Sequence, residues 1–263
     1  MQILLVADLH YALKQFDWVL SQADAFDIIV IAGDLLDISS FVPLDAQVAV
    51  VDAYLEKLAA RTELFVCSGN HDVTGLSETG EKTATWLTDH HRADFITDGG
   101  SAMFGAMLIS VLPWWDGPAT RAMIDAQFEE DAQRPHESWL WVYHAPPSDS
   151  PVSWGGNRFF GDPEHRSWIN KWQPNYVLSG HVHQAPFVPD GSWVSQIGNT
   201  RIFNMGQQPG EIPAHVILNT KEHAALWFSI YDNQQIDLAE PGSAPIPLAE
   251  LPNWVRDVGR RPG

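Results

Sequence analysis

Five short runs rich in histidine, aspartate and asparagine constrain the fold of this chain more than any other feature of its sequence. Each run directly follows an apolar stretch that predicts a buried strand. The runs are ADLH at residues 7–10, AGDLLD at 32–37, SGNHD at 68–72, YHAPP at 143–147 and SGHVH at 179–183. Ligands of open α/β sheets bind outside the carboxyl ends of the strands. We therefore expect all five runs to meet at one sheet edge and to form a single site.

Predicted strands alternate with predicted helices in the first part of the chain. Strands at 3–6, 27–31 and 64–67 alternate with helices at 14–22, 44–60 and 82–90. This alternation is typical of a parallel sheet with right-handed crossovers. The later sequence predicts a hairpin at 101–112, a helix at 120–132, strands at 140–143 and 176–178, and a meander over 201–231. The expected fold class is α/β, with two mixed β-sheets packed as a sandwich.

The length of the chain, 263 residues, suits one large domain with a full hydrophobic core. A linker between two smaller domains is not visible before the C-terminal part. From residue 241 onward the sequence is rich in proline, which predicts an extended tail that packs over the surface. We therefore expect a domain at residues 1–240 and a proline-rich tail at 241–263.

The strong negative charge narrows the choice of partners. The chain has 33 Asp and Glu residues against 15 Lys and Arg residues, a formal net charge of -18. Such a field repels polyanions at long range, so nucleic acid is disfavoured as a partner. The first apolar run is too short for a signal sequence or a membrane span, and the single cysteine, Cys67, cannot form an internal disulfide. We expect a cytoplasmic protein without a membrane partner; the sequence leaves its oligomeric state open.

The residue types in the five runs suit transition metals. Imidazole and carboxylate ligands together favour Mn, Fe, Zn or Ni over Mg and Ca, which prefer oxygen ligands alone. The two oxygens of a carboxylate such as Asp34 can bridge two ions, and two ions about 3.5–4 Å apart can clamp the attacking and leaving oxygens of an in-line displacement. Residues two apart in an extended chain point to the same side, so each Asp-x-His or His-x-His pair can reach one site. The glycines at 33, 69 and 180 are expected to let the backbone turn tightly at the strand ends.

Taken together, the five runs resemble the calcineurin-like metallophosphoesterase family over residues 3–206. The resemblance implies a two-sheet sandwich flanked by helices, with the family domain at 1–240, and two metal ions, Mn²⁺ and/or Fe with Zn²⁺ or Ni²⁺ as alternatives. It implies that His71 is a catalytic residue that stabilises the transition state or protonates the leaving oxygen, and that Asp72 orients His71. The implied ligands of the first metal are Asp8, His10, Asp34 and His183, and those of the second are Asp34, Asn70, His144 and His181.

The expected reaction is hydrolysis of a phosphoester by a metal-bridged hydroxide that attacks phosphorus in line. The expected substrate is a small phosphoester, and the resemblance adds nucleotides and cyclic nucleotides as candidates. A nuclease with the same chemistry is one alternative, which the charge disfavours. A non-catalytic scaffold on the same fold is another, which the complete ligand set disfavours. The sequence leaves open the metal pair, the substrate itself and the preference for monoesters or diesters.

Substrate selection is expected to depend on the loops between the runs. The loop at 145–162 begins beside His144, so it should border the site. Within it, Arg158 could pair with a phosphate group, and Trp154 could stack on a base. Two further aromatic residues, Trp114 and Trp115, could form another wall of the site. Packing of the loops themselves is the alternative explanation for each of these aromatic residues.

Overall fold

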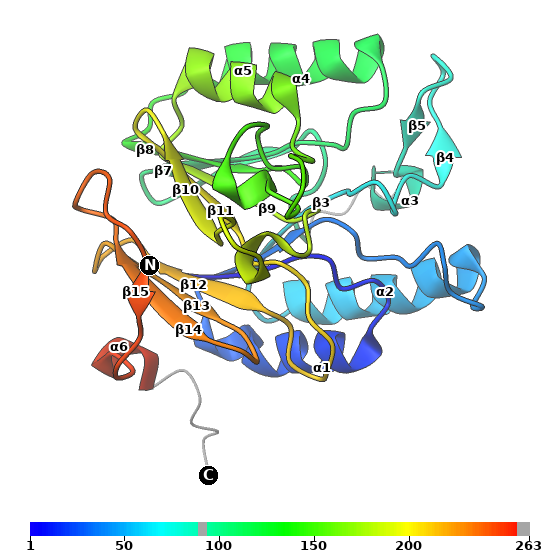
Figure 1. Cartoon of the computed structure of the whole chain (residues 1–263). Helices are drawn as coiled ribbons and strands as arrows, with labels where there is room; N and C mark the ends of the chain where they lie inside the picture. Colours follow the sequence, from blue (N-terminus) through cyan, green and yellow to red (C-terminus); the bar gives the residue numbers. More distant parts are fainter. Residues whose placement is uncertain (89–93, 257–263) are drawn as a thin grey trace.

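The computed structural model describes residues 1–88 and 94–256 and is built on two β-sheets packed face to face (Figure 1). The first sheet has the strand order β15 (Ile246–Pro247), β14 (Asn233–Asp237), β13 (Ala224–Phe228), β12 (His215–Asn219), β1 (Gln2–Val6), β2 (Ile28–Ala32) and β3 (Glu63–Cys67). Strands β1, β2 and β3 pair in parallel, and β12 joins β1 in antiparallel orientation. Strands β13, β14 and β15 continue from β12 as an antiparallel meander.

The second sheet has a parallel centre and antiparallel edges. Its strand order is β10 (Val194–Ile197), β11 (Thr200–Asn204), β9 (Tyr176–Ser179), β8 (Ser138–Val142), β7 (Met107–Val111) and β6 (Ser101–Phe104). Strands β11, β9, β8 and β7 are parallel to one another, whereas β10 and β6 are antiparallel to their neighbours. A separate two-stranded hairpin is formed by β4 (Gly75–Leu76) and β5 (Lys82–Thr83).

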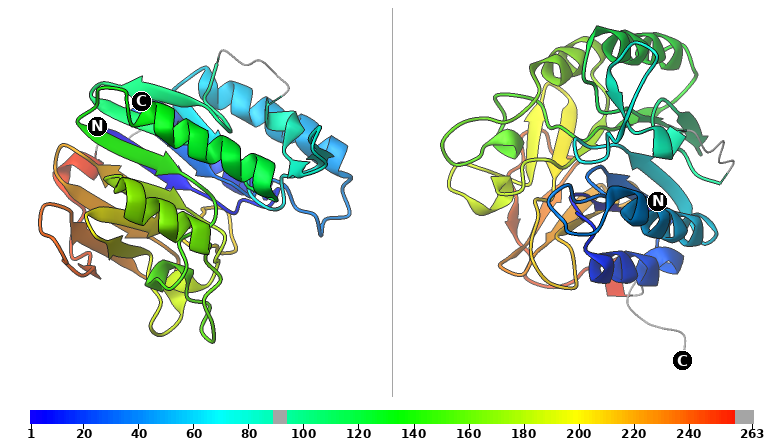
Figure 2. Two further views of the ribbon diagram at one scale, coloured as in Figure 1. Left: turned by 90° about the horizontal axis from the view of Figure 1, so that it is seen from above. Right: turned by 90° about the vertical axis from the view of Figure 1, so that its right-hand side faces the viewer.

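Helices cover the outer face of each sheet, as Figure 2 shows. In β1 the side chains alternate: Ile3 and Leu5 belong to the core between the sheets, while Leu4 and Val6 pack beneath the helices of the first sheet. The predicted class, an α/β sandwich of two mixed sheets flanked by helices, is confirmed. The first sheet is covered by α1 (Leu13–Gln22) and α2 (Leu44–Ala59), the second by α4 (Pro118–Asp131) and α5 (Pro163–Trp172), and the shorter helices are η1 (Ala23–Ala25), α3 (Thr85–Thr88), η2 (Pro151–Ser153), η3 (Ala185–Phe187) and α6 (Asn253–Arg256).

The helix predicted at 82–90 is wrong in its first part, where the chain forms β5. Tertiary contacts hold this segment in an extended conformation: the Glu81 carboxylate accepts hydrogen bonds from the Ala119 and Thr120 amides at the start of α4, and the Lys82 amide donates to Asp116. Of the described residues 82–88, only those of α3 are helical, and the predicted helix end at His90 lies outside the described residues. The start of α4 therefore decides the conformation of this segment.

Helix α5 was not predicted, although its start carries a sequence signal. Pro163 occupies the first turn, and the Asp162 carboxylate accepts a hydrogen bond from the Glu164 amide as an N-cap. The surrounding glycines, prolines and aromatic residues concealed this pattern in the sequence. The consequence for the site is that α5 packs behind β8 and stabilises the strand that ends next to His144.

The proline-rich tail forms more than an extended segment. Strand β15 pairs with β14, and Leu248, Trp254 and Val255 pack against the apolar core beneath α1 and α2. Residues 257–263 lie outside the described part of the chain. Among the described residues, no helix combines the length and apolar character that a membrane crossing requires.

Candidate metal centre

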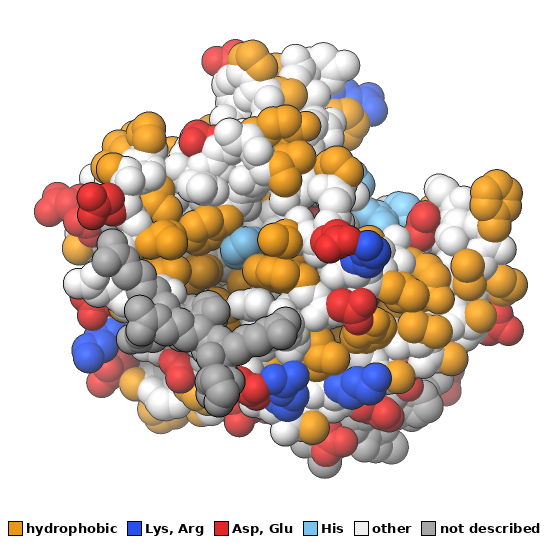
Figure 3. Space-filling view, turned by 90° about the horizontal axis from the view of Figure 1, so that it is seen from below, with side chains coloured by type: hydrophobic (Ala, Val, Ile, Leu, Met, Phe, Trp, Pro, Cys, Tyr) orange, Lys and Arg blue, Asp and Glu red, His pale blue; other side chains and the backbone are white. Residues whose placement is uncertain are grey.

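The five ligand runs meet at the carboxyl edge of both sheets. Strands β1, β2 and β3 are parallel neighbours in one sheet, and β8 and β9 are parallel neighbours in the other, so the loops that follow them leave from common edges. Figure 3 shows histidine side chains, coloured pale blue, at the surface in a notch between two protruding parts of the molecule. The sheet topology thus assembles residues that are far apart in the sequence.

The predicted ligands form two groups of side chains. Within each group, the nitrogen and oxygen atoms that could bind an ion lie within 4.8 Å of one another. The Asp34 carboxylate belongs to both groups, which is the arrangement that a bridging ligand requires. Asn70 lies beside the second group, because its Oδ1 is 2.9 Å from Nδ1 of His181. The structure therefore brings all the predicted ligands to one centre. The first group is Asp8, His10, Asp34 and His183, and the second is Asp34, His144 and His181.

The ring nitrogens converge as metal ligands do. Nε2 of His10 lies 3.1 Å from Nε2 of His183, which in turn is 3.2 Å from Oδ1 of Asp8. Nδ1 of His144 is 2.7 Å from the carbonyl oxygen of Ala32, and because a carbonyl only accepts, Nδ1 carries the hydrogen. Nε2 of His144 is then buried, lies 3.2 Å from Oδ2 of Asp34 and makes no hydrogen bond within the described part of the chain. This orphaned nitrogen and the mixed donor set fit a transition metal.

Charge interactions oppose burial at these groups. Burial alone would raise the pKa of Asp34, yet the charge of His144, whose Nε2 lies 3.2 Å from Oδ2, and the hydrogen bond from the His71 amide hold that pKa well below its usual value. Burial would lower the pKa of His144, but the charges of Asp34 and Asp8 raise it to about 9. Burial and repulsion from His144 lower the pKa of His181 to about 4. The carboxylates are therefore ionised at neutral pH, which is the form that binds cations.

Four of the ligand residues have a backbone conformation that is unusual outside glycine. The φ angles are 54° at Asp8, 42° at His10, 54° at Asp34 and 69° at His181. Such conformations cost on the order of 1–3 kcal/mol each and persist where the surroundings enforce them. Here the amides of Asp8 and His10 donate to the carbonyls of Gly33 and Asp34, both at 3.0 Å. The strain concentrates at the candidate metal centre, and no sequence pattern indicated it.

The three glycines next to the ligands permit close packing as well as turning. Gly33 has a φ of +85°, as expected for a tight turn, whereas Gly69 and Gly180 do not have left-handed φ angles. A Cβ atom on Gly69 would collide with Oδ1 of Asp34, and one on Gly180 would lie 2.6 Å from Oδ2 of Asp8. The chain does turn after Gly69 and Gly180, whose carbonyls accept the amides of Asp72 and Val182. Glycine is required there because a carboxylate lies against each backbone, and not by a left-handed φ.

His71 and Asp72 lie beside the ligands but do not contact each other in the predicted way. Nε2 of His71 is 4.0 Å from Oδ2 of Asp34, and its buried Nδ1 lacks a hydrogen bond to any described residue. The buried Asp72 carboxylate accepts hydrogen bonds from the amides of Leu35, Leu36 and Gly69. No hydrogen bond joins the side chains of Asp72 and His71 in the described part of the chain, so the orientation of His71 by Asp72 stays a prediction. Asp72 connects the loop of Asp34 to the loop of Asn70.

The two residues predicted to select the substrate are held by their own loop and its neighbour. The guanidinium carbon of Arg158 lies 4.4 Å from the ring centroid of Phe160. The indole N–H of Trp154 donates to the carbonyl of Pro189, and its ring centroid is 4.9 Å from that of Phe159. These contacts do not join either residue to a predicted ligand, so their substrate roles remain predictions.

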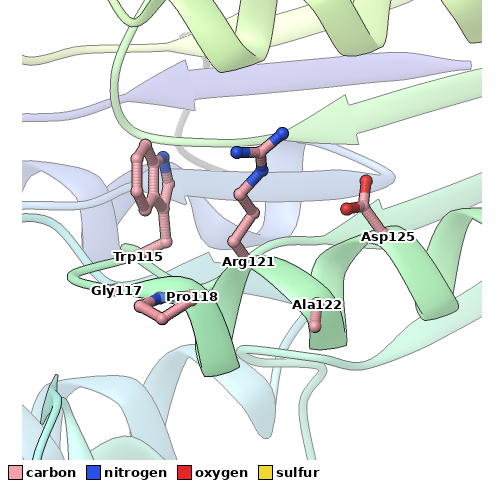
Figure 4. A pocket seen from close by; sticks show the side chains of 6 residues that line it. All are labelled: Trp115, Gly117, Pro118, Arg121, Ala122 and Asp125. Atoms are coloured by element: carbon pink, nitrogen blue, oxygen red, sulfur yellow. The ribbon is translucent and has the colours of Figure 1, made fainter.

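The tryptophan pair after β7 divides between two environments. The ring of Trp114 lies beside two ligand rings, with centroids 5.4 Å from His181 and 5.8 Å from His144. Trp115 instead lines a pocket of about 420 Å³ at the start of α4, where its side chain and that of Arg121 point to the same side (Figure 4). The described lining of this pocket contains no predicted ligand; it consists of Trp115, Gly117, Pro118, Arg121, Ala122 and Asp125.

Comparisons with known proteins identify a family and a fold. A family model described as calcineurin-like phosphoesterase matches residues 1–185. The fold is similar to that of the protein TT1561 from Thermus thermophilus, with a TM-score of 0.56, 12% identity, and coverage of 94% of this chain and 98% of that chain. It is also similar to a dimetal phosphatase from Danio rerio, with a TM-score of 0.52, 12% identity, and coverage of 86% and 95%. No curated protein matches the sequence.

Proposed function

Because the chain belongs to the calcineurin-like phosphoesterase family, we propose that it is a hydrolase of small phosphoesters that works with two metal ions. The observation that carries this proposal is the position of Asp34, whose carboxylate is shared by two adjacent groups of ligand atoms. Phosphoester hydrolysis by two ions needs such a shared ligand, because the ions must lie close together. The orphaned Nε2 of His144 supports the same proposal, since a bound ion would complete its contacts.

In this proposal each ion has a mixed set of nitrogen and oxygen ligands. Mn²⁺ and/or Fe are the proposed ions, with Zn²⁺ or Ni²⁺ as alternatives, because all of these accept both donor types. When bound, the ions would lower the pKa of a water molecule for in-line attack on phosphorus and would neutralise charge on the phosphoryl oxygens. The first ion would be held by Asp8, His10, Asp34 and His183, and the second by Asp34, Asn70, His144 and His181.

The protein itself orients these ligands through backbone contacts. Oδ1 of Asp34 accepts the amide of His71 at 2.9 Å, which directs Oδ2 toward Nε2 of His144. Both oxygens of Asp8 lie 3.1 Å from the amide of His181, so this carboxylate joins the loop after β1 to the loop after β9. Ligands that are preorganised in this way do not need to reorder when the substrate binds.

His71 is the proposed catalytic residue outside the ligand sets. Its ring centroid lies 4.6 Å from that of His10, and its side chain is partly exposed at the centre. A histidine in this position can donate a hydrogen bond to a phosphoryl oxygen or a proton to the leaving oxygen. We assign Asp72 a positioning role, because it holds the backbone on either side of the centre.

The charge of the protein supports a small substrate over a nucleic acid. A net charge of -18 repels a polyanion from a distance, whereas a small phosphoester carries little charge and meets the metal ions directly. Arg158 is proposed to pair with a further phosphate group of the substrate, and one of two aromatic side chains, Trp154 or Trp114, to cover its organic part.

A direct test is hydrolysis of bis-p-nitrophenyl phosphate and p-nitrophenyl phosphate by the Mn²⁺-loaded protein. We expect turnover of at least one of them, and we expect Asp34→Asn to abolish it while the fold is retained. The matched control is Asp45→Asn, which removes the same charge from an exposed position in α2 and should leave the rate unchanged. Near-normal activity in a metal-verified Asp34→Asn sample would contradict the mechanism.

A further inference from the structure

We propose that Trp114 is the surface on which a planar, aromatic part of the substrate stacks, beside the second group of ligand side chains. This inference rests on the proposed function and names the substrate class: phosphoesters whose organic group contains a flat ring. It also names Trp114, and not Trp154, as the residue that selects the substrate.

Strand order places Trp114 at the metal centre. Strands β9, β8 and β7 are parallel neighbours, so the loops after them leave from one edge of the second sheet. The loops after β9 and β8 carry His181 and His144, and the loop after β7 carries Trp114. The Leu112 amide donates to the carbonyl of Val142 at 2.9 Å, which keeps β7 aligned with β8 up to this loop. Trp114 thus occupies the position next to the ligand histidines.

The indole ring is placed against the ligand rings and remains available. Its plane is tilted by 48° to the ring of His181 and by 62° to the ring of His144, so it does not stack flat on either one. The side chain is partly exposed, and its N–H makes no hydrogen bond to the described residues. The neighbouring Trp115 differs, because its N–H donates to Oδ2 of Asp162 at 2.7 Å. The ring of Trp114 therefore has no structural hydrogen bond to maintain.

The backbone fixes Trp114 to the segment that carries a predicted ligand. The Trp114 amide donates to Oγ of Ser68 at 2.9 Å, and the Ser68 amide donates to Oδ1 of Asp98 at 2.8 Å. Ser68 is buried and lies two residues before Asn70. Because the same segment holds Asn70 and Trp114, the distance from the ligand to the indole is set before any substrate binds, and such preorganisation favours binding.

An indole in this position favours flat rings over aliphatic groups. Aromatic rings gain from offset or tilted contacts with one another, and stacking on a protein side chain is tolerant of the exact identity of the ring. The competing explanation is that Trp114 only shields the ligand histidines from water. A shield affects every substrate equally, whereas a stacking surface affects only those that contain a planar group.

The test compares two phosphonates that are not hydrolysed, phenylphosphonate and methylphosphonate, as ligands of the Mn²⁺-loaded protein in titration calorimetry. We expect the wild-type protein to bind phenylphosphonate roughly tenfold more tightly. Trp114→Ala should bring this ratio close to one and leave methylphosphonate binding unchanged. Trp114→Phe, which retains a flat ring, should keep most of the preference, and Trp154→Ala should keep all of it.

Three results would overturn the proposal: an equal loss of affinity for both phosphonates in Trp114→Ala, a preference for phenylphosphonate that survives this substitution, or a wild-type protein without the preference. Loss of the preference in Trp154→Ala alone would move the stacking surface to that loop and refute the role of Trp114. Since binding is measured without turnover, a protein that hydrolyses no phosphoester but shows the Trp114-dependent preference refutes the proposed function and not this inference.

Discussion

The substitution Gly69→Ala tests whether a ligand carboxylate requires the absence of a side chain at this position. A Cβ atom on Gly69 would lie 2.5 Å from the backbone nitrogen of Asp34, whereas ordinary contacts begin at 3.4 Å. The difference, 3.4 - 2.5, means that Asp34 or residue 69 must move by about 0.9 Å. Displacement of a reacting group by 1 Å costs about a hundredfold in rate, so we expect kcat/KM to fall by roughly that factor. Overpacking by a methyl group costs about 1–3 kcal/mol of unfolding free energy.

Metal analysis and steady-state kinetics measure the two consequences. We expect a lower metal content after gel filtration and a decrease in Tm of roughly 2–12 °C, from about 2–4 °C for each kcal/mol in a chain of this size. The control is Gly105→Ala in the turn between β6 and β7, where φ is +60° and no heavy atom lies within 4 Å of the added Cβ. Gly105→Ala causes backbone strain, because of the positive φ, but no collision. This variant should therefore lose stability and retain its metals and activity.

A Gly69→Ala protein with full metal content and wild-type kcat/KM would refute the reasoning, because Asp34 would then tolerate the displacement. An equal loss of activity in Gly105→Ala would also refute it, because the effect would follow from general destabilisation.

Further predictions concern single side chains and the ions. His71→Ala should lower kcat by about 10²–10⁴-fold with both metals retained in elemental analysis; loss of metal would identify His71 as a ligand. Asp72→Ala leaves three buried amides without an acceptor, at about 1–3 kcal/mol each, and should lower the urea midpoint strongly; a loss of only about a few tenths of a kcal/mol in the free energy of unfolding would contradict this. Burial raises the pKa of Asp98 to about 7 from 3.8, so the free energy of unfolding should fall as the pH rises through this range; Asp98→Asn should weaken that dependence in urea titrations at successive pH values, and Asp72, whose pKa burial raises to about 8, should supply the remainder. Chelation should lower the Tm, since ions that bind only the folded state stabilise it, and an unchanged Tm would argue against tight metal binding.

Much of the fold could be predicted because local patterns and tertiary contacts agree. Most buried strands of both sheets are short apolar runs, and those that the sequence predicts are found within one to three residues of the predicted end points; β10, β14 and β15 were not predicted. The failures occur where a contact from elsewhere decides the conformation. Glu81 is held by α4, so the predicted helix at 82–90 begins as a strand. The N-cap of α5 was present in the sequence but lay in a segment whose composition resembled a loop.

The sequence by itself determined the types of the candidate ligands, their order and their positions after strands, since these depend only on neighbouring residues. The tertiary structure decided how the ligands are held. It placed the amides of Leu35 and Leu36 on Asp72, oriented His144 through the carbonyl of Ala32, and left Trp114 beside the ligand rings. These contacts join residues from different strands and loops, and most of them involve backbone atoms. Backbone amides and carbonyls are present at nearly every residue, so only the folded arrangement can show which of them the site uses.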